Sequence, residues 1–231
     1  MTDGRSVDPL DALDALGVGG HGWDAESLRA VSPRQHASRR AADALRRLAV
    51  ALETTGANDV EIDDVATDLE RIAAAIPSPS GEVVADDPTL VYHAHRLRER
   101  SPFIGLANPV ALPLEMSFGD GTVEARPTFG TLYEGPPGCL HGGVIAGIFD
   151  EALGAAQTYA GQAGMTGRLT VHYRSPTPLH TELHLRAWLE SVNGRKVVCK
   201  GTLHAGERLC AEADGLFITI DPQRFLDPRR D

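Results

Sequence analysis

One carboxylate stands among glycines in a segment that otherwise has the pattern of a helix. The stretch GCLHGGVIAGIFDEALGAAQ, residues 138–157, carries Asp150 with Gly147 three residues before it and Gly154 four residues after it. Residues three and four apart share one helix face, and each interior glycine costs a helix about 1 kcal/mol relative to alanine. This helix face, on which glycines flank a single carboxylate, predicts that a second helix, a ligand or both approach the backbone there. The carboxylate could serve as nucleophile or general base. Glu151 points about 100° away, which predicts a surface or salt-bridge residue.

The start of the predicted helix offers a second chemical group. Gly142 and Gly143 follow His141 and the turn sequence EGPPG. The first amides of a helix lack intrahelical acceptors and lie at the positive end of its dipole, so they can bind an anion or a developing oxyanion. At 1.5 Å per residue, about 12 Å separates Gly142 from Asp150 along the helix. If both act on one carbonyl group, they come from two chains whose helices pair antiparallel.

Three other pairs of reactive side chains are better explained as structural. Free cysteine is more often a small core residue than a nucleophile, and two histidines four residues apart on a strand lie about 13 Å from each other. A pair of histidines without further ligands falls short of a tetrahedral metal site. We therefore expect no bound metal ion. The three rejected pairs are Cys139 with His141, His180 with His184, and His93 with His95.

Segments with a period of two surround the glycine-containing helix. Two of them flank the turn at 119–121, and four more follow the helix, including RLTVHYRS with its alternating Leu169, Val171 and Tyr173. One long helix among six antiparallel strands predicts an α+β domain in which the helix lies on the sheet. The helix face expected against the sheet consists of Ile145, Ile148, Phe149, Ala152 and Ala156.

The first third of the chain has a helical period instead. Apolar residues recur at spacings of three and four in RQHASRRAADALRRLAVALETT and in EIDDVATDLERIAAAI, with GAND between them. This pattern predicts a helical hairpin with one apolar seam. We divide the chain into a tail (1–26), a helical hairpin extension (27–78), a Pro/Ser/Gly linker (79–88), a main domain (89–222) and a second tail (223–231).

Composition narrows the class of protein. The chain has 231 residues, a net charge of −10 and a pI near 5.3, which disfavours a nucleic-acid-binding surface. Its three cysteines form no C-x-x-C motif, so we expect neither a disulfide framework nor a thiolate zinc site. This use of cysteine is typical of a protein from a reducing compartment. The acidic N-terminus lacks the pattern of a signal peptide, and no apolar run approaches the roughly 20 residues that span a bilayer. We expect a soluble cytoplasmic protein with no membrane partner.

The motif residues together resemble the PaaI-like hot-dog acyl-CoA thioesterases. The resemblance rests on EGPPG-x-x-HGG, on Asp150 nine positions after His141, and on the strand order, and it covers roughly residues 100–222. It is greatest to the mitochondrial thioesterase-superfamily branch, which has the same EGPPG-x-x-HGG run. The family implies a hot-dog fold, in which a curved antiparallel sheet wraps a long helix. It also implies a homodimer or homotetramer in which a continuous sheet joins two chains and the site lies at their interface.

The resemblance also implies roles for single residues. By motif match, Asp150 is the catalytic carboxylate in the hydrolysis of an acyl-CoA, Gly142 is the oxyanion donor from the partner chain, and His141 lines the same turn. Thr166 matches a Ser or Thr that helps to hold water, whereas the Asn that short members carry six positions before the His is Gly135 here. We expect no cofactor, since coenzyme A is part of the substrate, and a role in fatty acid metabolism. The alternative is a non-catalytic acyl-CoA-binding or regulatory hot-dog protein.

Coenzyme A is an anion and the chain is acidic, so binding requires local positive charge. The candidates are Arg174, Arg195 and Lys196, because each is positively charged and lies at the end of a predicted strand. Gly143 at the helix start is a further candidate. Their alternative role is ordinary solvated surface. The helical hairpin could shape an acyl tunnel, extend the dimer contact or bind another partner, and the sequence does not choose among these roles.

Overall fold

The computed structural model describes residues 32–77, 99–112, 114–162 and 164–219. The tails predicted at 1–26 and 223–231 and the linker predicted at 79–88 lie outside these ranges, as do His93 and His95.

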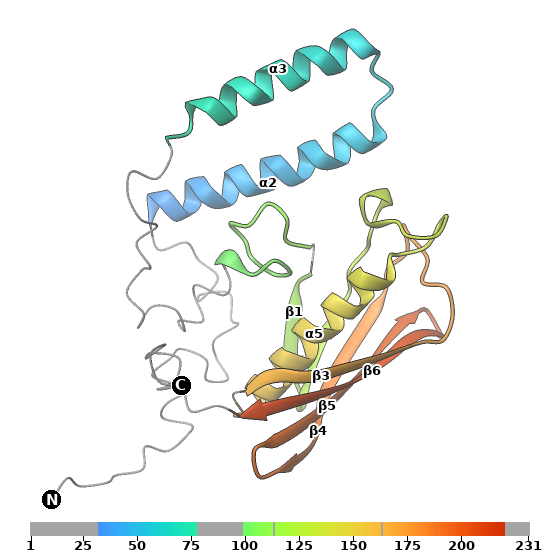
Figure 1. Cartoon of the computed structure of the whole chain (residues 1–231). Coiled ribbons are helices and arrows are strands. Elements are labelled where there is room, and N and C mark those ends of the chain that lie inside the picture. The colour runs from blue at the N-terminus through green and yellow to red at the C-terminus, as the bar shows by residue number, and fades with distance from the viewer. Residues whose placement is uncertain (1–31, 78–98, 113, 163, 220–231) are drawn as a thin grey trace, which may run out of the picture.

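Six antiparallel strands form one sheet with the order β1-β2-β4-β5-β6-β3. The helix α5 (Gly142–Tyr159) lies across one face of this sheet, as Figure 1 shows. The expected α+β class with a hot-dog arrangement is therefore confirmed. The strands are β1 (Met116–Gly119), β2 (Thr122–Ala125), β3 (Gly164–Tyr173), β4 (His184–Asn193), β5 (Lys196–Ala205) and β6 (Arg208–Thr219).

The core lies between α5 and the sheet. Every residue predicted to face the sheet is buried, with Ile148, Phe149 and Ala152 fully excluded from solvent. They pack in one cluster with inward-facing side chains of the strands, among them Leu185 and Phe217. Period-two strands and a period-3.6 helix each place their apolar residues on one side, which explains why this face could be predicted.

Two helices precede this domain in the described part of the chain, and both begin with a cap that the sequence supplies. The helix α2 (Pro33–Thr54) starts after Ser32, whose Oγ accepts the Gln35 amide at 3.2 Å. The helix α3 (Asp59–Ala75) starts after Asn58, which forms a capping box with Glu61. Side chains in these positions satisfy amides that the helix itself leaves without acceptors. The short 3-10 helix η2 (Thr131–Tyr133) comes later, shortly before α5.

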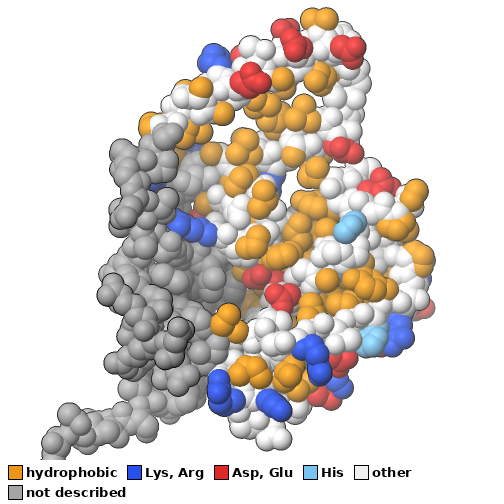
Figure 2. All heavy atoms as spheres, viewed as in Figure 1, with side chains coloured by type: hydrophobic (Ala, Val, Ile, Leu, Met, Phe, Trp, Pro, Cys, Tyr) orange, Lys and Arg blue, Asp and Glu red, His pale blue; other side chains and the backbone are white. Residues whose placement is uncertain are grey.

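The prediction of a single apolar seam between α2 and α3 is wrong. Leu45 of α2 is 47% exposed and Ile72 of α3 is 52% exposed, and Figure 2 shows apolar side chains at the surface over both helices. A different face of α2, formed by Arg39, Ala42 and Arg46, packs on the main domain instead. Two arginine contacts, rather than the apolar stripe, therefore set the orientation of this helix. None of the helices in the described ranges is long and apolar enough to cross a membrane.

Candidate active site

Asp150 of α5 and Thr166 of β3 meet beside the start of the sheet's edge strand. Thr166 Oγ1 donates a hydrogen bond to Asp150 Oδ1 over 2.9 Å. Strict alternation from Leu169 would turn Thr166 to the outer face of the sheet, but the register between β3 and β6 shifts between Thr166 and Arg168. This bulge leaves Gly167 as the extra residue and brings Thr166 to the same face as Leu169, toward the helix.

The helix start is shaped by a tight loop that ends at His141. The Glu134 carboxylate accepts the Gly138 amide at 2.5 Å, and Gly138 has a φ of 73°, a conformation that favours glycine. His141 is the N-cap of α5, and its Nδ1 accepts the Gly143 amide at 3.0 Å. The motif EGPPG-x-x-HGG therefore holds a sharp turn and then presents the first amides of a helix.

Gly135, which replaces the asparagine of short family members, has a packing role. A Cβ atom built on Gly135 would lie 2.9 Å from the Cα atom of His141, which is closer than real Cβ contacts come. The loop backbone therefore passes too near His141 for an asparagine at this position. Because glycine has no side chain, Gly135 can offer no side-chain hydrogen bond in place of that asparagine.

Tyr173 belongs to this region, although no role was predicted for it. Its hydroxyl donates to the Gly142 carbonyl over 2.9 Å, and its ring atoms lie 3.5 Å from a Cβ atom built on Gly142. Tyr173 alternates with Leu169 and Val171 and so shares their face of β3. That pattern could not tell which part of the helix the ring would reach.

Phe103, another residue that the sequence did not single out, approaches the glycine stripe. A Cβ atom built on Gly147 would overlap the Cε1 and Cζ atoms of the Phe103 ring, whereas one built on Gly154 would meet its nearest neighbour at an ordinary 3.9 Å. The predicted close approach therefore occurs at Gly147. Within the described chain, the group that comes close is a side chain from residues 99–112.

Glu151 is not the surface residue that we expected. It is half-buried, and its Oε2 accepts a hydrogen bond from Ser101 Oγ at 3.4 Å. Burial raises the pKa of the Glu151 carboxyl to about 7; the Ser101 hydrogen bond opposes this shift, and the negative charge of Asp150 adds to it. The position of Glu151 on the helix could not reveal that the segment 99–112 partly covers its side chain.

The three basic residues expected to bind coenzyme A do not gather within one chain. Arg174 donates to Glu212 over 3.0 Å from its Nε, and this bond lowers the pKa of the Glu212 carboxyl. Arg195 donates from its Nε to the Thr219 carbonyl at 3.2 Å. The Arg174 amide bonds the Cys210 carbonyl, whereas Lys196 pairs with Ile218. Eight residues of β6 separate these two points, about 26 Å at the usual rise of a strand.

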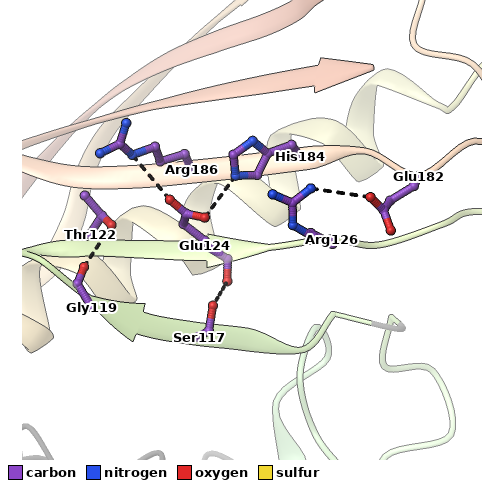
Figure 3. A network of polar contacts seen from close by, with 8 residues as sticks. All are labelled: Ser117, Gly119, Thr122, Glu124, Arg126, Glu182, His184 and Arg186. Carbon is purple, nitrogen blue, oxygen red and sulfur yellow. Dashed lines mark hydrogen bonds and ion pairs between the residues drawn. The ribbon is translucent and has the colours of Figure 1, made fainter. Parts of the chain in front are cut away.

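One histidine of the rejected pair, His184, contacts a carboxylate of the neighbouring strand. His184 Nε2 lies 3.0 Å from Glu124 Oε2, and Arg186 Nε lies 3.6 Å from the other oxygen of the same carboxylate (Figure 3). Val123 and Ala125 are buried toward α5, so the Glu124 cluster lies on the opposite face of the sheet. Among the residues that the structure describes, no group of three or more His, Cys, Asp or Glu side chains could hold a metal ion.

Comparison with known proteins finds relatives of this chain. The family model of the thioesterase superfamily matches residues 137–212. The acyl-coenzyme A thioesterase THEM4 of Xenopus laevis is 40% identical over 95 residues, and that of Bos taurus is 35% identical over 97 residues. These matches cover 40% and 41% of this chain, and they span only 43% and 40% of the two relatives.

A solved structure gives a broader match. The crystal structure of a thioesterase superfamily protein has a TM-score of 0.67 and 34% sequence identity to this chain. The match covers 78% of this chain and 94% of that protein, so it extends well beyond the segment that the family model matches. From its fold, its motif and these matches, the chain belongs to the thioesterase superfamily.

Proposed function

We propose that the protein is an acyl-CoA thioesterase, which hydrolyses an acyl-CoA to a free carboxylic acid and coenzyme A. The contact between Thr166 and Asp150 carries the proposal, because it holds one carboxylate in a fixed orientation beside a helix face with little side-chain bulk. The names of the THEM4 relatives support the same substrate class. We propose a cytoplasmic role in fatty acid metabolism.

Asp150 acts either as general base, removing a proton from the attacking water, or as the nucleophile itself. In the first route the water oxygen bonds to the thioester carbon, and the C–S bond breaks as the thiolate leaves and takes up a proton. In the second route an Asp150 carboxylate oxygen attacks the thioester carbon, and the C–S bond breaks as the thiolate leaves and takes up a proton. Water then hydrolyses the acyl-aspartyl anhydride to the free acid and restores the Asp150 carboxylate. Thr166 is a positioning residue in both routes. Reaction in ¹⁸O-labelled water distinguishes them, because only the anhydride route can place the label in Asp150.

The oxyanion that develops on the thioester needs a hydrogen-bond donor. The Gly143 amide is already bonded to His141 Nδ1, so we assign the oxyanion to the Gly142 amide at the first position of α5. A helix N-terminus stabilises negative charge at this place, and loss of one such donor costs other hydrolases about a hundredfold to a thousandfold in rate.

Two chains build each site in this proposal. Gly142 and Asp150 of one chain are about 12 Å apart along α5, too far for one carbonyl group. Tyr173 bonds Gly142 and Thr166 bonds Asp150, and these two β3 residues are themselves about 20 Å apart. If β3 pairs antiparallel with its copy about a centre between residues 169 and 170, Tyr173 of one chain lies beside Thr166 of the other. Gly142 of the partner subunit then approaches Asp150.

The character of β3 supports this pairing. It stands at the edge of the sheet, runs for 10 residues, and exposes Met165 and Tyr173 at 55% each. Proteins seldom leave so long an edge strand uncovered, because its free backbone groups pair readily with another chain. A copy of the same strand would cover both the backbone edge and these apolar side chains.

The activity is tested by release of coenzyme A thiol from a panel of short, medium, long and aryl acyl-CoA substrates, in the presence of EDTA. We expect hydrolysis of at least one of them. Tight binding of acyl-CoA without hydrolysis of any substrate would favour the alternative, a non-catalytic acyl-CoA-binding or regulatory protein.

The shared site is tested by complementation. Gly142→Pro removes the amide hydrogen without breaking the helix, since proline is well tolerated at the first position of a helix. Gly142→Ala is the matched control, which adds side-chain bulk but keeps the amide. We expect Gly142→Pro and Asp150→Asn each to be inactive, and a mixture with exchanged chains to recover activity through one intact site. An active monomer, or an inactive mixture with exchange and folding verified, would contradict the shared site.

A further inference from the structure

A segment before the sheet, residues 99–112, lies against the face of α5 that carries Asp150. The half-buried ring of Phe103 occupies the place where a side chain at Gly147 would stand, and Ser101 Oγ reaches Glu151 Oε2 over 3.4 Å. Gly147 is three residues before Asp150, so the two lie one above the other on the same helix face. The Phe103 ring is therefore a wall of the space beside the candidate catalytic carboxylate.

The segment is held in shape by its own hydrogen bonds. Ser101 Oγ accepts the amides of Phe103 at 3.0 Å and of Ile104 at 3.2 Å. The side chain of Asn108 donates to the carbonyls of Arg100 at 3.0 Å and of Ser101 at 3.3 Å. These bonds fix the backbone on both sides of Phe103, so the ring is presented by a preorganised turn.

The helix α2 anchors this turn from outside. Arg39 Nε lies 3.0 Å and 3.3 Å from the two carboxylate oxygens of Glu99, and Arg39 Nη2 bonds the nearer one. The side chains of Arg39 and Glu99 are only 19% and 11% exposed, so this forked pair is largely shielded from water. Arg46 Nη1 donates to the Asn108 carbonyl over 2.8 Å. The helix α2 is thus tied to both ends of the turn that carries Phe103.

We propose that Phe103 is a specificity-determining residue, which limits the acyl group that fits beside Asp150, and that α2 acts as its support. The inference rests on the proposed function. An acyl chain is apolar and must leave the thioester along an apolar surface, and an aromatic ring seated on a bare glycine is a rigid surface of that kind. Gly147 matters because any side chain there would displace the ring.

The first test measures kcat/KM over a series of straight-chain acyl-CoA substrates and one aryl acyl-CoA. Phe103→Ala should raise the ratio of kcat/KM for long chains to that for short chains by about tenfold, since about two extra methylene groups gain contact. Phe103→Leu should give a smaller shift. Phe118→Ala is the matched control, because Phe118 is also half-buried but its ring contacts that of Tyr159 in a tilted arrangement at the far end of α5. An unchanged ratio in Phe103→Ala would overturn the inference.

A second test needs no catalysis and measures the thermal unfolding midpoint. Gly147→Ala should lower Tm in the wild-type background by several degrees, because the new methyl group collides with the ring. In the Phe103→Ala background the same change should be neutral or stabilising, since alanine is the better helix former. Equal losses in both backgrounds would show that the ring does not sit on Gly147.

The two tests separate the possible failures. A wild-type protein that hydrolyses no acyl-CoA would refute the proposed function, and the specificity role with it, whatever the unfolding data show. Hydrolysis with an unchanged chain-length ratio in Phe103→Ala would refute the specificity role alone. The support by α2 is tested with Arg39→Met, which should shift the chain-length ratio in the same direction as Phe103→Ala. An unchanged chain-length ratio in Arg39→Met would overturn the supporting role of α2 and leave Phe103 alone as the specificity-determining residue.

Discussion

Replacement of Glu151 by glutamine should stabilise the protein, and more so as the pH rises. Burial raises the pKa of this carboxyl from 4.5 to about 7 in the folded state, so the folded protein binds a proton there more tightly than the unfolded chain does. Stability must then fall as the pH rises from about 4.5 to about 7. At 1.36 kcal/mol per pKa unit, the loss reaches about 3 kcal/mol, as an upper figure for a side chain that is only partly buried. Glutamine keeps the shape and stays neutral.

Urea unfolding at pH 5, 6, 7 and 8, at one protein concentration, measures this effect. The advantage of Glu151→Gln should be below about 1 kcal/mol at pH 5 and grow to about 3 kcal/mol at pH 8. Glu190→Gln is the matched control with the opposite sign: hydrogen bonds from Lys200 and Trp188 lower the pKa of the exposed Glu190 carboxyl, so its removal should give no gain. Parallel curves for wild type and Glu151→Gln across this range would refute the reasoning.

Three further changes probe the site and the core. Thr166→Val should lower kcat/KM for thiol release by about tenfold, the worth of one hydrogen bond to a charged group, whereas Thr166→Ser should remain near wild type. A wild-type rate in Thr166→Val would remove the positioning role. Tyr173→Phe should cost about 1 kcal/mol in urea unfolding through loss of its bond to the Gly142 carbonyl, and no change would make that bond incidental. Phe149→Ala should cost about 3–5 kcal/mol because Phe149 is fully buried, and a cost below 1 kcal/mol would contradict the packing of α5 on the sheet.

Local periodicity predicted the elements and the buried face of α5, because both depend on residues a few positions apart. It could not predict which face of α2 packs on the domain. The apolar stripe pointed to Leu45, whereas Arg39 and Arg46 make the contacts through partners some 60 residues away in the chain. Contacts at such separations leave no repeating pattern in a single sequence.

In the candidate site, too, some residues could be predicted from the sequence and others could not. Asp150 stood out through its glycine neighbours, and Thr166 came from the family resemblance, because strict alternation would have turned it outward. Only the bulge at Gly167 brings Thr166 to the helix. Phe103 was missed because its position depends on a turn built from side-chain bonds, although the glycine at 147 did indicate that some group comes close there.

The central claim is that Asp150 carries out thioester hydrolysis, and the most direct measurement compares the rate of coenzyme A thiol release by wild type and by Asp150→Asn. Both proteins are assayed on the best acyl-CoA of the panel, in EDTA, with folding verified by urea unfolding. The proposal predicts that kcat falls by about two to four orders of magnitude in Asp150→Asn, while Glu151→Gln and Cys139→Ala stay within about tenfold of wild type, roughly 1.4 kcal/mol in activation free energy. A folded Asp150→Asn protein with the wild-type rate would contradict it.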